Sequence, residues 1–311
     1  MLSDRVRERL EQLNRTALPA RSKTNARQQP LTTNGSCKAT ISPNHNSYLP
    51  SGSAVGTPYG KHWLIQQPLE QLWPRGPKLI EQTTRYENPI VEERDPDLFQ
   101  LECFFPHRIL WLDLETCGFA GSMVFLAGVM HLESDGIVLT QLWARNYAEE
   151  KALLHTLWTL VQRSNLLMTF NGKSFDWPQV QDRSTLHHLG TSCPGTEKIQ
   201  ELRYEPFYLD AHSDRPEIGH FDLLHHARRR WKSQLPNCKL QTLERYICGR
   251  NRVGDIPGRD IPLAYHDYVR TGNTEQVRSI LHHNALDLVT LLQLSLTFIG
   301  YQPCLKSRVA S

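Results

Sequence analysis

The sequence predicts an α/β protein in which a mixed β-sheet is flanked by helices and followed by a helical C-terminal part. Three apolar segments with strand character follow one another between residues 108 and 145, joined by short turns. A helical segment and a fourth strand then alternate, and residues 221–298 carry mostly helical periodicity. This order of elements is typical of a sheet that has helices on both faces.

Composition is compatible with a large domain and predicts a cytoplasmic protein. Among the 311 residues, 39% are hydrophobic and 22% are charged, and the formal net charge is +3. The seven cysteines form no C-x-x-C pair, which argues against a disulfide framework and a cysteine-rich zinc site. The first residues lack the apolar core of a signal peptide, and no apolar run approaches the roughly 20 residues that span a bilayer. We therefore expect no membrane association, and no obligate protein partner is evident.

Four segments are expected along the chain. Residues 1–60 form a disordered or weakly structured tail, because 16–60 is rich in Pro, Gly, Ser, Thr and Asn and contains no acidic residue. Residues 61–100 form a lead-in segment that could supply an edge strand. The main domain spans 101–300, and a short tail occupies 301–311.

The first strands follow from alternating or continuous apolar runs. The segments RILWLDLET, SMVFLAGVMHL and IVLTQLWAR predict strands at 108–116, 122–132 and 137–145, and their short turns imply an antiparallel meander. A helix is predicted over 149–165 from its apolar spacing. The fourth strand, LLMTF, covers 166–170 and ends at an Asn-Gly turn.

The second half of the domain is predicted to be mainly helical. A helix begins within residues 174–189, where Pro178 suits the first turn. Further helices are expected in FDLLHHARRRW (221–231), KLQTLERYIC (239–248), PLAYHDYVR (262–270) and TEQVRSILHHNALDLVTLLQLSLTF (274–298).

Two carboxylates interrupt the first apolar strand. Asp113 and Glu115 are two residues apart, so their side chains point to the same face of the sheet. Placed together there, they repel each other and lose hydration. A divalent cation such as magnesium, which takes oxygen ligands, removes both penalties. The alternative is that the strand emerges into water at Asp113.

Two later acidic positions add to this pair. Asp176 follows the fourth strand near a helix start, where helix capping and the helix dipole also favour an aspartate. On the last helix, Asn284 and Asp287 interrupt an otherwise apolar stripe. A charge on a buried stripe is seldom unpaired. The alternatives are metal binding and a hydrogen bond to a neighbouring helix cap.

The ordered set of D-x-E, N-G-x-x-F-D and H-N-x-x-D resembles the DEDD superfamily of 3′→5′ exonucleases, which has an RNase H-like fold. The segments FDLLHHARRRW, NCKLQTLERYICG, VGDIPGRDIPLAYHDYVRTG and HHNALDLVTLL resemble the YprB-type RNase H-like family. The resemblance covers about residues 100–298. It implies an RNase H-like mixed β-sheet and a hydrolase that acts on phosphodiester bonds of single-stranded DNA or RNA.

The resemblance also implies a metal site and a general base. Two divalent ions, Mg²⁺ or Mn²⁺, would clamp the attacking and leaving oxygens, and their expected ligands are Asp113, Glu115, Asp176 and Asp287. The superfamily places a histidine five residues before the last aspartate or a tyrosine four before it, and this chain has His282 and His283 at those spacings. We favour His283 because it shares a helix face with Asp287, although His282 stays open.

A basic run is expected to bind nucleic acid through phosphate contacts. It comprises Arg228, Arg229, Arg230 and Lys232, and further cations follow at Lys239, Arg245, Arg250 and Arg252. Trp231 could stack on a base, but a place in the core is favoured. Lys173 could approach the scissile phosphate, whereas Asn171 shapes a turn or contacts the substrate. Asp222 is interpreted as a structural partner.

The leading hypothesis is therefore a metal-dependent 3′→5′ exonuclease. The main alternative is a non-catalytic nucleic-acid-binding RNase H-like module, which would bind equally well without metal. A protein-interaction scaffold and a phosphodiesterase acting on a small nucleotide are two further possibilities.

Overall fold

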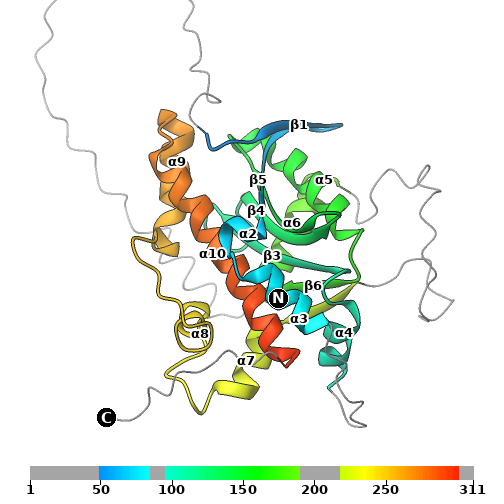
Figure 1. Ribbon diagram of the computed structural model, residues 1–311. Helices are drawn as coiled ribbons and strands as arrows, with labels where there is room; N and C mark the ends of the chain where they lie inside the picture. Colours follow the sequence, from blue (N-terminus) through cyan, green and yellow to red (C-terminus); the bar gives the residue numbers. More distant parts are fainter. Residues whose placement is uncertain (1–48, 85–94, 190–217, 301–311) are drawn as a thin grey trace, which may run out of the picture. The chain divides into compact units, whose positions relative to one another are not determined.

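A seven-stranded mixed sheet organises the part of the chain that the computed structural model describes, residues 49–84, 95–189 and 218–300 (Figure 1). The strand order is β1-β2-β5-β4-β3-β6-β7. The five strands from β1 to β3 in this order pair antiparallel, and β6 and β7 continue the sheet in parallel with β3. This mixed sheet with flanking helices confirms the predicted fold class.

The predicted meander forms as β3 (Ile109–Thr116), β4 (Val124–Glu133) and β5 (Gly136–Trp143). The fourth predicted strand is β6 (Leu166–Thr169). One strand was not predicted: β7 (Gly219–Asp222) begins before the segment that was expected to be wholly helical. Its four residues form a strand through pairing with β6, a long-range contact that local sequence does not reveal.

The N-terminal edge of the sheet also differs from expectation. Strands β1 (Ser53–Thr57) and β2 (Gly60–Pro68) form a hairpin, and β2 pairs with β5. The expected lead-in strand is thus an inner strand, and regular structure starts before residue 60, the predicted end of the tail. Strand β1 is short and mostly exposed, and its sequence SAVGT carries no clear apolar alternation, so only its pairing with β2 identifies it. The expected tail at 1–48 and the tail at 301–311 lie outside the described residues.

The predicted helices all form, with ends shifted by a few residues. The α-helices in the described ranges are α2 (Leu69–Leu72), α3 (Gly76–Thr84), α4 (Pro96–Phe104), α5 (Glu150–Val161), α6 (Asp176–Leu186), α7 (Leu223–Trp231), α8 (Leu240–Tyr246), α9 (Ile261–Thr271) and α10 (Glu275–Phe298). Across residues 49–84, 95–189 and 218–300, none of them combines the length and apolar character that crossing a membrane requires.

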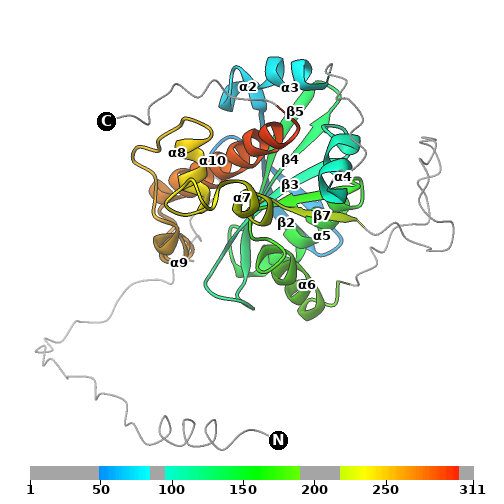
Figure 2. The ribbon, with the colours of Figure 1, turned by 90° about the horizontal axis from the view of Figure 1, so that it is seen from below.

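Alternation along β3 divides the core between the two sheet faces. Leu110, Leu112 and Leu114 pack in one cluster with residues of α5, α6 and α9. Trp111 points to the other face, where α10 crosses the sheet (Figure 2). The indole N–H of Trp111 donates to the Ser295 hydroxyl of α10 at 2.9 Å. Since side chains two residues apart share a face, β3 directs its two carboxylates toward α10.

Candidate active site

Strand β3 presents Asp113 and Glu115 where helix α10 crosses the sheet. Both residues are partly buried, so the strand does not simply emerge into water. The Asn284 amide of α10 donates to the Asp113 carboxylate at 2.8 Å and to the Asp113 carbonyl at 3.1 Å. Helix α10 is therefore fixed to β3 at the first carboxylate.

Two residues that sequence reasoning missed orient this amide. Gln141 of β5 donates from its side chain to Asn284 Oδ1 at 2.9 Å. Gly128 of β4 lies between Asp113 of β3 and Gln141 of β5, and it is in register with both residues. A Cβ at Gly128 would stand 1.9 Å from Asn284 Oδ1, so a glycine is required. The signal was a lone glycine inside an apolar strand, which marks a close approach.

Asp176 reaches the same place from the start of α6. The helix N-cap is Phe175, so capping does not account for the aspartate. The buried Asp176 carboxylate instead accepts from the backbone N–H of Leu114 at 3.3 Å. This bond ties the start of α6 to β3, between the two carboxylates of that strand.

Asp222 shapes the loop that precedes Asp176. The fully buried Asp222 carboxylate accepts from the backbone N–H groups of Asn171 at 2.8 Å and Lys173 at 3.1 Å. It also caps α7 by accepting from the N–H of Leu224 at 3.0 Å. Asn171 has a left-handed φ of 65°, which an Asn-Gly turn accommodates. These bonds agree with the interpretation of Asp222 as a structural partner, and Asn171 and Lys173 remain exposed beside the site.

The carboxylates are close enough to disfavour one another's ionisation. Burial raises the pKa of Asp113 well above its usual range, and the charges of Asp287, Glu115 and Asp176 raise it further, against the hydrogen bond from Asn284. Burial followed by the charges of Asp287 and Asp176 likewise raises the pKa of Glu115. Burial raises the pKa of Asp176 to about 7. A cation in their midst would reverse all three shifts.

Asp287 is held by an arginine. The Arg252 guanidinium is largely buried, and one of its terminal nitrogens donates to the Asp287 carboxylate. The same nitrogen also donates to Glu244 Oε2, at 2.6 Å. The other terminal nitrogen of Arg252 donates to Asp255 Oδ2 at 3.0 Å. Burial raises the pKa of Asp287, although Arg252 and His283 oppose that shift. The aspartate on this buried stripe is thus hydrogen-bonded, but its partner is an arginine rather than a helix cap.

The structure distinguishes the two adjacent histidines. His282 is exposed, whereas His283 is buried on the face that carries Asp287. His283 Nδ1 lies 2.8 Å from Asp255 Oδ2, and Nε2 lies 3.4 Å from Asp287 Oδ2. The chain therefore places His283 at the carboxylates.

The predicted basic run on α7 does not point toward the carboxylates of the candidate site. Arg228 and Lys232 are exposed along and just beyond α7. Arg229 pairs with Asp95 at 2.9 Å. Arg230 donates to the carbonyl of Thr297, which is ten residues beyond Asp287 and so about 15 Å along α10. If the basic run contacts nucleic acid, it therefore contacts a part of the nucleic-acid strand that lies away from the carboxylates.

Two other expectations about this region are resolved. Trp231 is buried and packs with Phe298 at a ring-centroid distance of 5.2 Å, which confirms its place in the core. Arg250 and Arg252, expected to face phosphates, both turn inward to the buried Glu244. A buried carboxylate that attracts two arginines from nearby loop positions was not evident from sequence.

The donor set suits a hard divalent cation. Asp113, Glu115 and Asp176 offer only carboxylate oxygens, the ligands that Mg²⁺ and Mn²⁺ prefer. Within the described ranges, no three acidic, histidine or cysteine side chains already stand at metal-binding spacing. The hydrogen bond from Arg252 to Asp287 is consistent with the absence of such a ready-made group among the described residues, because it occupies one oxygen of Asp287, the fourth carboxylate. The residues fit a metal by their chemistry and by their uncompensated charge.

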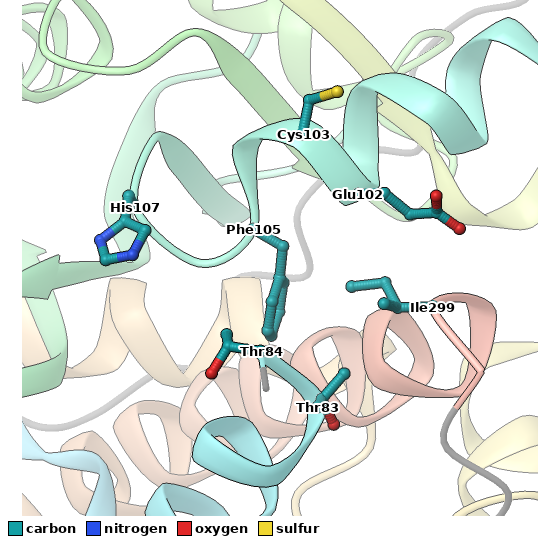
Figure 3. Close-up of a pocket in the computed structure, with 7 residues that line it drawn as sticks. All are labelled: Thr83, Thr84, Glu102, Cys103, Phe105, His107 and Ile299. Carbon is teal, nitrogen blue, oxygen red and sulfur yellow. The ribbon is translucent and has the colours of Figure 1, made fainter. Parts of the chain in front are cut away.

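A cavity of about 360 Å³ lies elsewhere (Figure 3). It is lined by Thr83, Thr84, Glu102, Cys103, Phe105, His107 and Ile299. The Phe105 ring points toward Thr84 in this view. Ile299 is twelve residues beyond Asp287, about 18 Å along the axis of α10. This cavity is therefore separate from the carboxylates.

Comparison with known proteins agrees with this architecture. Over 191 residues the chain is 32% identical to the uncharacterized protein YprB of Bacillus subtilis (strain 168). That alignment covers 60% of this chain and 41% of YprB, so the chain spans less than half the length of this relative. Residues 110–298 match the model of the family described as the RNase_H superfamily. Because that match covers more than half of the chain, the protein belongs to the RNase H superfamily and carries a YprB-type RNase H-like domain.

Proposed function

We propose that the chain is a metal-dependent nuclease that releases nucleotides from the 3′ end of single-stranded DNA or RNA. Membership of the RNase H superfamily suggests a nuclease or another nucleic-acid-related function. The observation that carries the finer proposal is the gathering of four carboxylates, from β3, α6 and α10, that raise one another's pKa. Their mutual repulsion lowers the stability of the folded protein unless a bound cation offsets it.

Asp113, Glu115 and Asp176 would hold the divalent ions, and Asp287 would join them once Arg252 releases it. Bound there, the ions would neutralise the phosphodiester and activate the attacking water. His283 lies beside Asp287 and would accept the proton of that water. Asn284 would keep the Asp113 carboxylate turned toward the centre.

A direct test compares the full chain with Asp113→Asn. Single-stranded DNA and RNA, labelled at the 5′ end, are incubated with Mg²⁺, with Mn²⁺ and with EDTA. We expect a ladder of shortened products with either metal, none in EDTA, and a loss of at least about 100-fold in Asp113→Asn. Asp182→Asn is the matched control, because Asp182 is exposed on the same helix as Asp176.

The substrates can be chosen to define the reaction. A 3′-phosphorylated strand and a circular strand should resist cleavage if attack begins at a free 3′ end. Cleavage of the circle would instead indicate an endonuclease. Absence of any cleavage by the wild-type chain, on both polymers and with both metals, would refute the proposal.

One observation favours a second candidate, the non-catalytic nucleic-acid-binding module. Arg252 already supplies a positive charge to Asp287, as it would if an arginine had taken the place of a metal. Such a module would bind oligonucleotides with the same affinity in Mg²⁺ and in EDTA. Fluorescence anisotropy at low salt separates the two candidates, since the nuclease should bind more tightly with a non-catalytic metal such as Ca²⁺ than in EDTA.

A further inference from the structure

We infer that Asp255 is a positioning residue that fixes the tautomer and the orientation of His283 toward the carboxylates. This inference deepens the proposed function, because a catalytic role for Asp255 rests on the proposed nuclease activity. Asp255 lies in the loop between α8 and α9, within the segment VGDIPGRDIPLAYHDYVRTG, and it is not one of the carboxylates or histidines that the motifs singled out. It reaches His283 across 28 residues of chain.

The hydrogen bonds around Asp255 determine which ring nitrogen carries a proton. Asp255 Oδ2 accepts from Arg252 at 3.0 Å, so this side chain is held as a carboxylate. A carboxylate oxygen can only accept, and His283 Nδ1 faces it at 2.8 Å. Nδ1 must therefore carry the hydrogen. Nε2 is left as the nitrogen that can take or release a proton, and it lies 3.4 Å from Asp287.

Burial makes this arrangement rigid. The side chains of Asp255 and His283 are 10% and 9% exposed, respectively, and α10 fixes the backbone of the histidine. Asp255 Oδ1 is buried and has no hydrogen-bond partner among the described residues. An unpaired buried carboxylate oxygen costs stability. A residue kept only to brace the loop would not need that cost.

The pair has the features of a carboxylate-oriented general base. The aspartate holds one ring nitrogen and stabilises the imidazolium that forms, while the other nitrogen meets the reactant. In the proposed hydrolysis, the water O–H bond breaks and its proton passes to His283 Nε2. The water oxygen bonds to phosphorus as the P–O3′ bond breaks, and the leaving oxygen takes a proton from solvent. The imidazolium then returns its proton to solvent.

The tautomer can be measured without any activity. Full-length protein with ¹⁵N-labelled histidine is studied by long-range ¹H–¹⁵N NMR in EDTA and in Mg²⁺. His283→Gln identifies the resonances of His283, and His282→Gln is the exposed control. We expect Nδ1 to be protonated in the wild type and the Nε2–H form to gain population in Asp255→Ala, which removes the oxygen that Nδ1 faces. A wild-type His283 whose Nδ1 lacks a proton would overturn the inference.

Kinetics then test whether the pairing matters for catalysis. Asp255→Asn should lower kcat about 10- to 100-fold and change KM by less than about twofold. Asp260→Asn, at an exposed aspartate five residues away, should retain wild-type rates. In a His283→Gln background, Asp255→Asn should cost less than about twofold more, because both changes remove one function. Additive losses would show that Asp255 acts on folding or on Arg252 instead, and would overturn the inference.

The two proposals fail in different ways. A wild-type chain that cuts no substrate refutes the nuclease, while the NMR result still decides how Asp255 orients His283. Cleavage that depends on Asp113 but not on Asp255 supports the nuclease and refutes the positioning role. Circular dichroism of each variant shows whether it folds, and the wild-type NMR measurement needs no variant other than the one used for assignment.

Discussion

The side-chain amide of Asn284 lies so close to Gly128 that a Cβ at the glycine would stand 1.9 Å from Asn284 Oδ1. Asn284 is fully buried and bonded to both Gln141 and Asp113, so it cannot easily move aside. The glycine therefore allows α10 to approach the centre of the sheet closely. The orientation of the first carboxylate depends on this approach.

Gly128→Ala should lower the free energy of unfolding by about 1–3 kcal/mol, since the new methyl group overpacks a buried site. It should also reduce any metal-dependent activity, because a displaced Asn284 no longer orients Asp113. Urea unfolding in EDTA measures the stability. Gly56→Ala is the control, because a Cβ at Gly56 meets open space, and its effect should stay within about 0.5 kcal/mol. Equal stabilities of the two variants would contradict the close contact.

Local periodicity predicted the faces on which three acidic residues of the candidate site lie, whereas the resemblance to the DEDD superfamily added Asp176 to the expected set. The two-residue spacing of Asp113 and Glu115 fixes their common face, and the helical stripe around Asp287 fixes the face of α10. The choice of His283 over His282 followed from the same periodicity and agrees with the burial of the two side chains. Regular elements impose these relationships whatever the tertiary structure.

The residues that complete the site depend on register and on loop placement, which a single sequence does not specify. Gly128 and Gln141 act together only because β4 pairs with β3 and β5 in one particular register. Asp255 and Arg252 reach the site from an irregular loop, whose path follows from tertiary packing. Strand β7 likewise forms only beside β6. The sheet order and the inward turn of the arginines were therefore beyond local patterns.

Asp176→Asn should stabilise the metal-free protein at alkaline pH. The pKa of Asp176 is about 7 in the folded chain, against about 3.9 when unfolded. The folded state thus holds the extra proton between these values, and the free energy of unfolding falls as pH rises from about 4 to about 7. The variant removes this loss, worth on the order of 1–4 kcal/mol at pH 8. Thermal or urea unfolding in EDTA across this pH range measures it.

Magnesium should reverse the ranking of these two proteins. A cation bound only by the folded wild type adds about 2.7 kcal/mol at a hundred times its Kd, and the variant should gain much less. Asp260→Asn, whose side chain is 53% exposed, should follow the wild type in both conditions. If Asp176→Asn were less stable than wild type at pH 8 in EDTA, the carboxylates would not be under the repulsion described above.

Arg252→Gln should destabilise the metal-free protein and enlarge its response to metal. Removing this buried cation leaves Glu244, Asp255 and Asp287 without their shared partner, which typically costs about 3–5 kcal/mol. The same change frees an oxygen of Asp287, so the rise in melting temperature on adding Mg²⁺ should exceed that of wild type. Calorimetry in EDTA and Mg²⁺ compares them, with the exposed Arg270→Gln as control. No response to Mg²⁺ in either protein would favour the non-catalytic module.

The basic run on α7 should divide into residues that bind nucleic acid and a residue that stabilises the fold. Arg228 and Lys232 are exposed, so the double change to glutamate should weaken binding to single strands of any sequence. The slope of log K against log salt should become shallower by about 0.7 for each phosphate that the variant no longer neutralises. Anisotropy titrations at several salt concentrations measure both quantities.

Arg230→Gln should behave in the opposite way. This guanidinium donates to the Thr297 carbonyl and lies over the Trp231 ring at 5.3 Å from its centroid, so it anchors α7 to the end of α10. Its loss should lower the free energy of unfolding by about 1–3 kcal/mol while leaving the salt slope nearly unchanged. If this variant changed the slope as much as the double glutamate variant does, Arg230 would also contact phosphate. The surface that contacts nucleic acid would then extend from α7 to the end of α10.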